Sequence, residues 1–349
     1  MSKFQILETY PEITILHHIE PDGTLWGSSG RKILQKRDEE DWQEITSFPK
    51  VPARDLFSFW RPTARALRAD KCNIYVNSLG NILGIRASQV YVIKENKPPL
   101  PLFQINGDSV LHGGICEDTE GWSYVGEYFM NPKRDPARIW RISPELKHWE
   151  PAFTFEAGSI RHVHGIYPDP YDPDALWATT GDFENECYLF RTDNRFNSIQ
   201  QFGDGTQMWR AVRIFFTRDH ICWLTDSNLT QNYACRMRRS DGMIEIGQKI
   251  DASAWYGAMT SEGQYIAFTT VEPGPGIHTD MSSILISEDG FSWKVQYQFK
   301  KDYWRPMKLF KYGVISCPSG KMSGKEFYIS GEGLDGLDGA SLKVDIGLD

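Results

Sequence analysis

Arginine, histidine and tryptophan residues recur along the chain at a nearly constant spacing. Three copies of the recurring segment pair a tryptophan with an arginine: Trp60-Arg61-Pro62-Thr63, Trp209-Arg210-Ala211-Val212 and Trp304-Arg305-Pro306-Met307. Weaker copies are Ser109-Val110-Leu111-His112, Arg161-His162-Val163-His164 and Trp255-Tyr256-Gly257-Ala258. Arginine can hold an anion and histidine can transfer a proton, so a fold that gathers these copies would create a site for an anionic ligand.

The repeated arginines are the strongest indication of a binding site. They are Arg61, Arg161, Arg210 and Arg305. A guanidinium group presents paired N–H donors that match a carboxylate, sulfate or phosphate, so we expect these side chains to bind an anionic ligand together. The alternative is that each arginine pairs with a neighbouring acid, such as Asp182 or Asp226, and ties one repeat to the next.

The histidines offer acid–base chemistry or metal binding. His162 and His164 are two residues apart, so on a β-strand both side chains face the same side. With Asp182 they could hold a metal ion, but no second pair of ligands is evident, and we predict no cofactor and no metal. His112 occupies the repeat position of His164, so two imidazoles facing one cavity could serve as acid and base. The alternative is that these histidines are structural.

Tyr128 follows Glu127 directly, and a tyrosine beside a carboxylate can act as a nucleophile or as an acid. The alternative is that Tyr128 packs and Glu127 neutralises an arginine. The candidate catalytic residues are therefore His112, His164, Tyr128, Glu127 and Asp182, and the candidate ligand-binding residues are Arg61, Arg161, Arg210, Arg305, His162, Tyr256 and Asp226. The repeated tryptophans could stack on sugar rings or pack between repeats; they are Trp60, Trp209, Trp255 and Trp304.

The spacing of the copies indicates the fold that positions them. With Arg61, Ser109, Arg161, Arg210, Tyr256 and Arg305 taken as equivalent, the steps are 48, 52, 49, 46 and 49 residues. A period of this length is typical of one four-stranded blade of a β-propeller. We predict an all-β chain that forms a single β-propeller domain over residues 1–349, with seven four-stranded blades, or six as the alternative count. A circular array would place equivalent residues around one axis.

The apolar pattern within a unit predicts four strands. In the fourth unit they cover residues 161–167, 175–180, 186–191 and 198–202, separated by turn residues. The N-terminal residues 4–9 could supply the outermost strand of the last unit. This pairing would close the ring and remove its exposed sheet edges.

The two inner strands of a blade meet at one face of the disc, because the first strand starts where the second strand ends. The loop that leaves the second strand therefore contributes to the same mouth as the repeated segment. This loop supplies Asn77, Glu127, Tyr128, Asp182, Asp226 and Glu272. We expect arginines, histidines, acids and a tyrosine to converge at this opening of the central channel.

Composition excludes several classes of protein. The net charge of −8, from 38 basic and 46 acidic residues, argues against a protein that wraps nucleic acid or lies on an anionic membrane. The first eight residues lack the basic start and apolar core of a signal peptide, and no later run approaches a membrane span, so we expect a cytoplasmic protein. The six cysteines form no CxxC pair and are expected to be buried free thiols.

A second recurring segment carries a family resemblance. Ser287-Glu288-Asp289-Gly290-Phe291-Ser292-Trp293 resembles the Asp-box, the β-hairpin turn of sialidase-like and BNR-repeat propellers, and Ser143-Pro144-Glu145-Leu146-Lys147-His148-Trp149 is a degenerate copy. In such a turn the aspartate and serine hold backbone amides while the tryptophan packs beneath. The resemblance implies a structural role for Asp289 and not a catalytic one.

Two kinds of enzyme fit these residues. A sialidase-like mechanism, as the resemblance implies, would use Arg61, Arg210 and Arg305 to hold a sugar carboxylate, Tyr128 with Glu127 as nucleophile, and Asp182 as acid or base. In a polysaccharide lyase, an arginine such as Arg161 would neutralise a uronate, and His112 or His164 would remove the proton beside it, with Tyr128 as the acid.

We therefore predict a carbohydrate-active enzyme, a glycoside hydrolase or a lyase, that binds a small anionic sugar or oligosaccharide in the central channel. The expected partners include neither nucleic acid nor a membrane, and the sequence leaves the oligomeric state open. The alternative is a propeller without catalysis that serves as a ligand-binding or protein-interaction scaffold, because fold alone never establishes chemistry.

Overall fold

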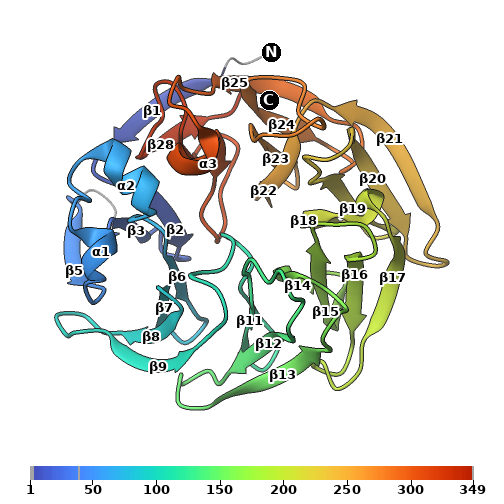
Figure 1. Ribbon diagram of the computed structural model, residues 1–349, viewed down its shortest axis with the longest axis horizontal. Helices are drawn as coiled ribbons and strands as arrows, with labels where there is room; N and C mark the ends of the chain where they lie inside the picture. Colours follow the sequence, from blue (N-terminus) through green and yellow to red (C-terminus); the bar gives the residue numbers. More distant parts are fainter. Residues whose placement is uncertain (1–3, 38–39, 348–349) are drawn as a thin grey trace.

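The computed structural model describes residues 4–37 and 40–347. Over these residues the strands form seven four-stranded sheets that surround a central axis, as Figure 1 shows. This arrangement is a seven-bladed β-propeller, so the predicted all-β fold and the blade count of seven are confirmed. Neighbouring strands within the sheets are antiparallel, and the first six blades take their strands in chain order from the axis outwards.

The strand bounds follow the blades along the chain. Blade 1 consists of β2 (Ile15–Ile19), β3 (Leu25–Ser29), β4 (Lys32–Lys36) and β5 (Gln43–Ser47). Blade 2 consists of β6 (Asn73–Val76), β7 (Ile82–Arg86), β8 (Gln89–Ile93) and β9 (Leu100–Gln104). Blade 3 consists of β10 (Cys116–Glu117), β11 (Ser123–Gly126), β12 (Ala137–Ile142) and β13 (Trp149–Phe155).

Blades 4 to 6 have the same plan. Blade 4 consists of β14 (His162–Asp169), β15 (Asp172–Gly181), β16 (Cys187–Thr192) and β17 (Gln200–Gly205). Blade 5 consists of β18 (Ala211–Phe216), β19 (His220–Thr225), β20 (Asn232–Arg238) and β21 (Ile244–Ile250). Blade 6 consists of β22 (Ser253–Met259), β23 (Tyr265–Thr270), β24 (Met281–Ser287) and β25 (Lys294–Lys300).

Blade 7 joins the two ends of the chain. It consists of β26 (Val314–Ser316), β27 (Phe327–Glu332), β28 (Ala340–Asp345) and β1 (Gln5–Tyr10). β1 pairs antiparallel with β28, from Gln5 opposite Asp345 to Tyr10 opposite Ser341. The predicted N-terminal outer strand is therefore present, and it closes the ring by covering the edge of β28.

Blades pack on one another through apolar side chains. Between blades 4 and 5 the buried core includes Trp177 of β15 and Trp223 of β19, and Trp209 stacks on Trp223 with ring centroids 5.4 Å apart. Trp209 therefore packs between blades, which was the alternative to sugar stacking. All six cysteines are buried and free of disulfides, as expected from their place in apolar runs.

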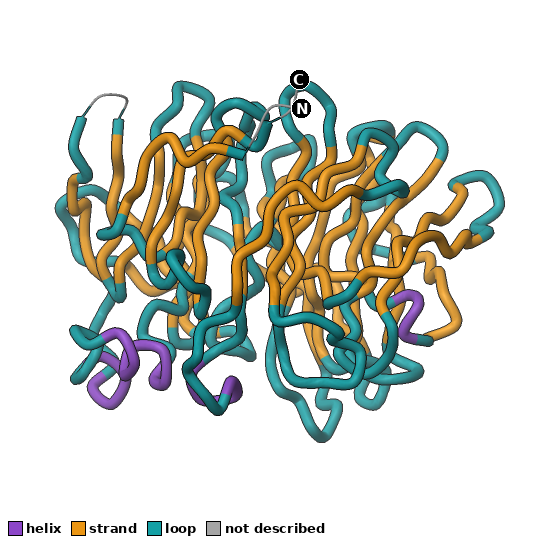
Figure 2. The backbone as a smooth tube through the Cα atoms, turned by 90° about the horizontal axis from the view of Figure 1, so that it is seen from above, coloured by secondary structure: helices purple, strands orange, loops and turns teal. Residues whose placement is uncertain are grey.

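Short helices lie on one face of the disc. α1 (Pro52–Asp55) and α2 (Arg61–Leu67) lie between blades 1 and 2, the 3-10 helix η1 (Gln207–Trp209) precedes blade 5, and α3 (Met307–Phe310) precedes blade 7. Figure 2 shows the helical segments toward the same face of the disc. The innermost strands of blades 2, 5 and 7 start shortly after these helices in the chain. Over the described ranges, no helix has the length and apolar character needed to span a membrane.

Two copies of the repeated segment begin helices instead of strands. Arg61 opens α2, with Pro62 in its first turn, and Pro306 caps α3. Proline favours the first turn of a helix because its fixed φ suits the helix and its missing N–H needs no partner there. The innermost strands of blades 2 and 7 start only at Asn73 and Val314. The predicted equivalence of Arg61 and Arg305 with Arg161 and Arg210 is therefore wrong.

The segment that resembles an Asp-box forms the turn between β24 and β25. Asp289 Oδ1 accepts hydrogen bonds from the backbone N–H groups of Phe291 at 2.9 Å and Ser292 at 2.7 Å. Ser287 Oγ donates to the same oxygen at 2.9 Å, and Trp293 is buried beneath the turn. Burial acts to raise the pKa of Asp289, but these hydrogen bonds lower it to about 2. Asp289 thus stabilises a hairpin, as the resemblance implied.

Candidate functional site

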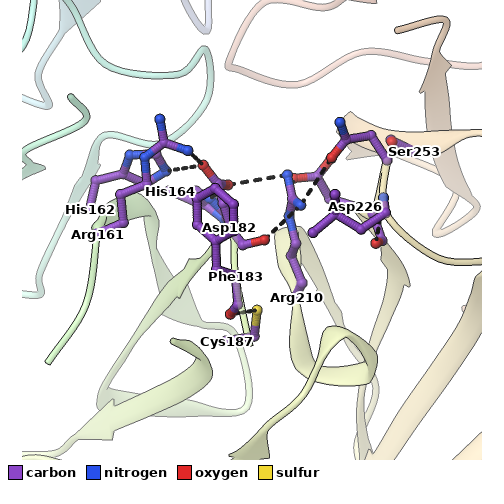
Figure 3. A network of polar contacts seen from close by, with 12 residues as sticks. Arg161, His162, His164, Asp182, Phe183, Cys187, Arg210, Asp226 and Ser253 are labelled. Atoms are coloured by element: carbon purple, nitrogen blue, oxygen red, sulfur yellow. Dashed lines mark hydrogen bonds and ion pairs between the residues drawn. The ribbon is translucent and has the colours of Figure 1, made fainter. Parts of the chain in front are cut away.

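A buried polar cluster lies on blades 3 to 6 at the helix-bearing face. Figure 3 shows its central part, where side chains from the start of β14 and from the loops after β15 and β19 meet. The cluster contains Tyr128, Arg161, His162, His164, Asp182, Arg210, Asp226, Ser253 and Glu272. The fold therefore brings together many of the residues that the sequence places at one mouth.

Asp182 is the centre of this cluster. Its Oδ1 lies 3.2 Å from Nε2 of His164 and 3.2 Å from Nη2 of Arg210. Its Oδ2 lies 3.4 Å from Nε2 of His162 and also accepts a hydrogen bond from Arg161. Burial acts to raise the pKa of Asp182, but the surrounding histidines and Arg210 hold it well below its usual range. This carboxylate is therefore ionised at neutral pH.

The histidines reach Asp182 from the first strand of blade 4. His162 and His164 alternate with Val163 on β14, and the register of β14 against β15 shifts between Val163 and Gly165. Such a bulge adds a residue to one strand and re-aims the side chains beside it. The rings of the two histidines have centroids 5.0 Å apart, and Tyr128 covers His162 at 4.2 Å.

Arg210 links Asp182 to a pair of acidic residues, Asp226 and Glu272. Its Nε lies 3.1 Å from Oδ2 of Asp226, and burial raises the pKa of Asp226. Burial, followed by the charge of Asp226, raises the pKa of Glu272 to about 8. Ser253 donates its hydroxyl to Glu272 Oε1 at 2.7 Å. At neutral pH the pair formed by Asp226 and Glu272 therefore retains a proton.

The structure does not gather the four repeated arginines into a ring. Arg210, which precedes blade 5, pairs with Asp182 of blade 4, which is the tie between repeats that the sequence left as the alternative. Arg161 pairs with Asp182 within blade 4. Arg61 pairs with Asp70 at 2.5 Å and with Asp338 at 3.1 Å. Arg305 is exposed and donates to the backbone carbonyl of Asp302 at 2.6 Å.

Glu127 stabilises blade 3 and the loop before it through hydrogen bonds. Its carboxylate accepts hydrogen bonds from the N–H of Asn106 at 3.0 Å, the N–H of Arg138 at 3.0 Å and the indole N–H of Trp140 at 3.1 Å. These bonds occupy the carboxylate, so the expected activation of Tyr128 by Glu127 has no support in this geometry. Tyr128 instead packs against His162, with the two rings tilted by 42°.

His112 and Tyr256 lie deeper, on the central axis. The His112 ring has its centroid 5.8 Å from that of Tyr256 and 5.4 Å from that of His17. The two pockets that His112 lines do not include His164. Burial lowers the pKa of His112 to about 4, so its imidazole is neutral at physiological pH.

A cavity of about 450 Å³ occupies this part of the axis. All seven blades contribute to its wall, through His18, Tyr75, Glu117, Tyr167, Arg213, Ala258 and Cys317. His112, Trp255 and Tyr256 complete its polar and aromatic lining. Its size and mixture of aromatic and polar groups are those of a site for a small molecule.

Arg213 is the cation of this cavity, and the sequence analysis missed it. Its guanidinium carbon lies 4.9 Å from the ring centroid of Tyr167 and 5.9 Å from that of Phe215. Its Nε is buried without a hydrogen-bond partner, and in the described part of the chain no carboxylate lies within ion-pair distance. The signal was a single charge in the otherwise apolar strand β18.

Comparisons with known proteins agree on the fold alone. No family model matches the chain, and no curated protein matches it. Among solved structures, the extracellular domain of BT4673 from B. thetaiotaomicron is similar, with TM-scores of 0.57 and 0.52 in two structures and 10% and 9% identity. Each alignment covers 99% of this chain but only 40% and 39% of those chains. BBS1N in complex with ARL6DN is similar over 98% of this chain and 96% of that chain, with a TM-score of 0.56 and 10% identity.

Proposed function

We propose that the protein binds a small acidic sugar in the axial cavity, with Arg213 as the contact for the sugar's anionic group. The observation that carries this proposal is a guanidinium without a carboxylate partner that faces a cavity of about 450 Å³. A partly buried arginine attracts a carboxylate, sulfate or phosphate strongly because the low local dielectric strengthens the interaction. Arg213 thus favours a negatively charged group on its own side of the cavity, whose wall also contains Glu117.

The wall of the cavity favours a sugar among anionic molecules. Tyr167, Trp255 and Tyr256 present aromatic rings, while His18 and Tyr75 present groups that can exchange hydrogen bonds with hydroxyls. A sugar acid combines one anionic group with apolar ring faces and several hydroxyls. This proposal places the anion contact at Arg213 instead of the arginines that recur in the sequence.

We propose further that the bound sugar acid is a substrate for β-elimination. Arg213 would neutralise the carboxylate and so acidify the carbon-bound proton beside it. His112 lines the same cavity and is neutral at physiological pH, so it can accept that proton while the bond from the neighbouring carbon to its oxygen breaks and a carbon–carbon double bond forms. A tyrosine hydroxyl of the cavity, such as that of Tyr256, would return a proton to the leaving oxygen.

The sialidase-like route is the less favoured reaction. It needs a carboxylate that activates Tyr128, and Glu127 is engaged by the backbone of blade 3. The Asp-box turn supports the resemblance only at the level of one hairpin. Elimination requires no such activation, since Arg213 and His112 share one cavity.

Calorimetric titration would test binding. The titrants are uronates, sialic acid, and sulfated and phosphorylated sugars, each beside its neutral counterpart. We expect acidic sugars to bind, and Arg213→Gln to weaken them about 10–100-fold, the value of a hydrogen bond to a charged group. The matched control is Arg236→Gln, which removes a half-buried arginine that does not line the cavity and whose Nη2 lies 2.7 Å from Glu245. An unchanged affinity in Arg213→Gln would refute the binding proposal.

Turnover is tested separately, by the ultraviolet absorbance of an unsaturated product and by loss of that signal in His112→Gln. Binding without turnover would leave a sugar-binding propeller without catalysis. Absence of binding by every sugar would favour the scaffold alternative, and affinity capture of protein partners would follow.

A further inference from the structure

The two histidines at Asp182 have a fixed proton arrangement. His162 Nδ1 lies 2.7 Å from the backbone carbonyl oxygen of Phe129, and His164 Nδ1 lies 2.8 Å from that of Ala211. A carbonyl oxygen only accepts hydrogen bonds, so Nδ1 must carry the proton on each ring. In a neutral imidazole, Nε2 then presents a lone pair.

Both of these Nε2 atoms point toward the carboxylate of Asp182, as Figure 3 shows. Nε2 of His162 is buried and has no hydrogen-bond partner. The two Nε2 to carboxylate distances are 3.4 and 3.2 Å, whereas charge-assisted N–H to oxygen bonds are typically about 2.7–2.9 Å. The contacts are therefore too long to be strong hydrogen bonds from protonated rings.

Each imidazole faces a different oxygen of Asp182, at a separation close to that between two ligands of one metal ion. Zinc binds imidazole nitrogen and carboxylate oxygen at about 2.0–2.2 Å, and a tetrahedral angle then places two ligand atoms about 3.3 Å apart. One ligand atom from each of His162, His164 and Asp182 lies within 4.8 Å of the others. Donation of the second ring nitrogen to a backbone carbonyl is also the usual way in which proteins orient a ligating histidine.

We propose that His162, His164 and Asp182 form a binding site for a divalent first-row transition ion. Two imidazoles and one carboxylate are a ligand set that both zinc and ferrous iron accept, and three protein ligands leave a coordination position open. Arg161 and Arg210 pair with Asp182, and Arg210 also pairs with Asp226, so two arginines face two carboxylates. A bound divalent ion would make the site net positive, and an anion would then be drawn to the open position.

The cluster is closed toward the protein and reached from the helix-bearing face. His162 and His164 are each 2% exposed, whereas the side chains of Asp182 and Arg161 are each 13% exposed. The Tyr128 ring packs against His162, with ring centroids 4.2 Å apart. These ligands do not belong to the wall of the axial cavity, so the metal proposal stands independently of sugar binding at Arg213.

The test is metal binding by the full chain after chelation and dialysis. Zn²⁺ is titrated against a fluorescent competitor, and Co²⁺ is followed by the visible absorbance of its d–d bands. We expect one equivalent of either ion. His162→Gln, His164→Gln and Asp182→Asn should each weaken binding about 100-fold or more, since the groups that merely orient metal ligands already contribute about 10–100-fold.

The matched control is His220→Gln, because His220 is a half-buried histidine on β19 outside the cluster. Asp182→Asn also weakens the pairs with Arg161 and Arg210, so near-ultraviolet circular dichroism must show that each variant is folded. His162→Gln keeps both arginine pairs and serves as the safer variant. Failure of the chelated wild-type protein to bind either ion would overturn the proposal, as would binding that the three ligand variants leave unchanged.

Discussion

The carboxyl group of Glu272 makes the stability of the protein depend on pH in an unusual direction. Glu272 follows β23 in blade 6, is 7% exposed, and faces the charge of Asp226. Its pKa is raised from the ordinary 4.5 to about 8, chiefly by burial. In the unfolded chain the same group titrates near its ordinary value.

The sign follows from counting protons. Below pH 4.5 both states hold the proton and Glu272 contributes no difference. Between 4.5 and about 8 the unfolded chain has lost the proton while the folded protein keeps it, so the free energy of unfolding falls as pH rises. Above the folded pKa both states are ionised, and the free energy of unfolding stays at its lowered value. Linkage with these two pKa values gives a loss of about 3 kcal/mol between about pH 5.5 and about pH 8.5.

Glu272→Gln removes this titration and keeps the size of the side chain. We expect the variant to gain stability relative to wild type as pH rises, by about 3 kcal/mol over the same interval. Urea unfolding followed by tryptophan fluorescence at each pH measures the difference. Glu245→Gln is the control, because Glu245 is fully exposed on β21. Parallel pH profiles for wild type and Glu272→Gln would refute the assignment of a buried, protonated carboxyl.

Two further predictions concern the packing of blades. Asp169 accepts hydrogen bonds from both Nη atoms of Arg239, at 2.5 and 3.0 Å, and from the indole of Trp177, so Asp169→Ala should cost about 3 kcal/mol in urea unfolding. A loss below about 1 kcal/mol, as for an exposed ion pair, would contradict this view of the junction between blades 4 and 5. Deletion of residues 1–10 removes β1 and bares the edge of β28, so light scattering should detect concentration-dependent association and the melting temperature should fall. A truncated protein with the oligomeric state and melting temperature of the full chain would show that β1 is dispensable for closure.

The architecture was predictable because the apolar pattern of a blade is local. Strand segments expected at residues 175–180 and 186–191 correspond to β15 and β16, and the N-terminal strand expected at residues 4–9 to close the ring corresponds to β1. Strand period and turn residues are set by neighbours in sequence. They can therefore be predicted without knowledge of the contacts between blades.

The site was predictable only in part, because pairing between loops depends on the final position of each side chain. The sequence placed His162, His164, Asp182 and Arg210 at one mouth, and the fold brings them into contact. It did not predict that Arg161 and Arg210 both pair with Asp182. Arg61 does not occupy the predicted repeat position, because Pro62 favours a helix there. The repeat spacing does not predict this helix. Arg213 was not predicted because it lies just after the repeated segment that contains Arg210.

The closure of blade 7 has a practical consequence for handling the protein. Because Gln5 pairs with Asp345, these two residues near the ends of the described chain lie side by side, on the side of the disc away from the helices. A short linker could join them, so circular permutants that open the ring at an exposed turn are feasible. A tag or surface tether attached at either end would likewise leave the helix-bearing face, with Asp182 and its partners, turned toward solution and free for ligand titration.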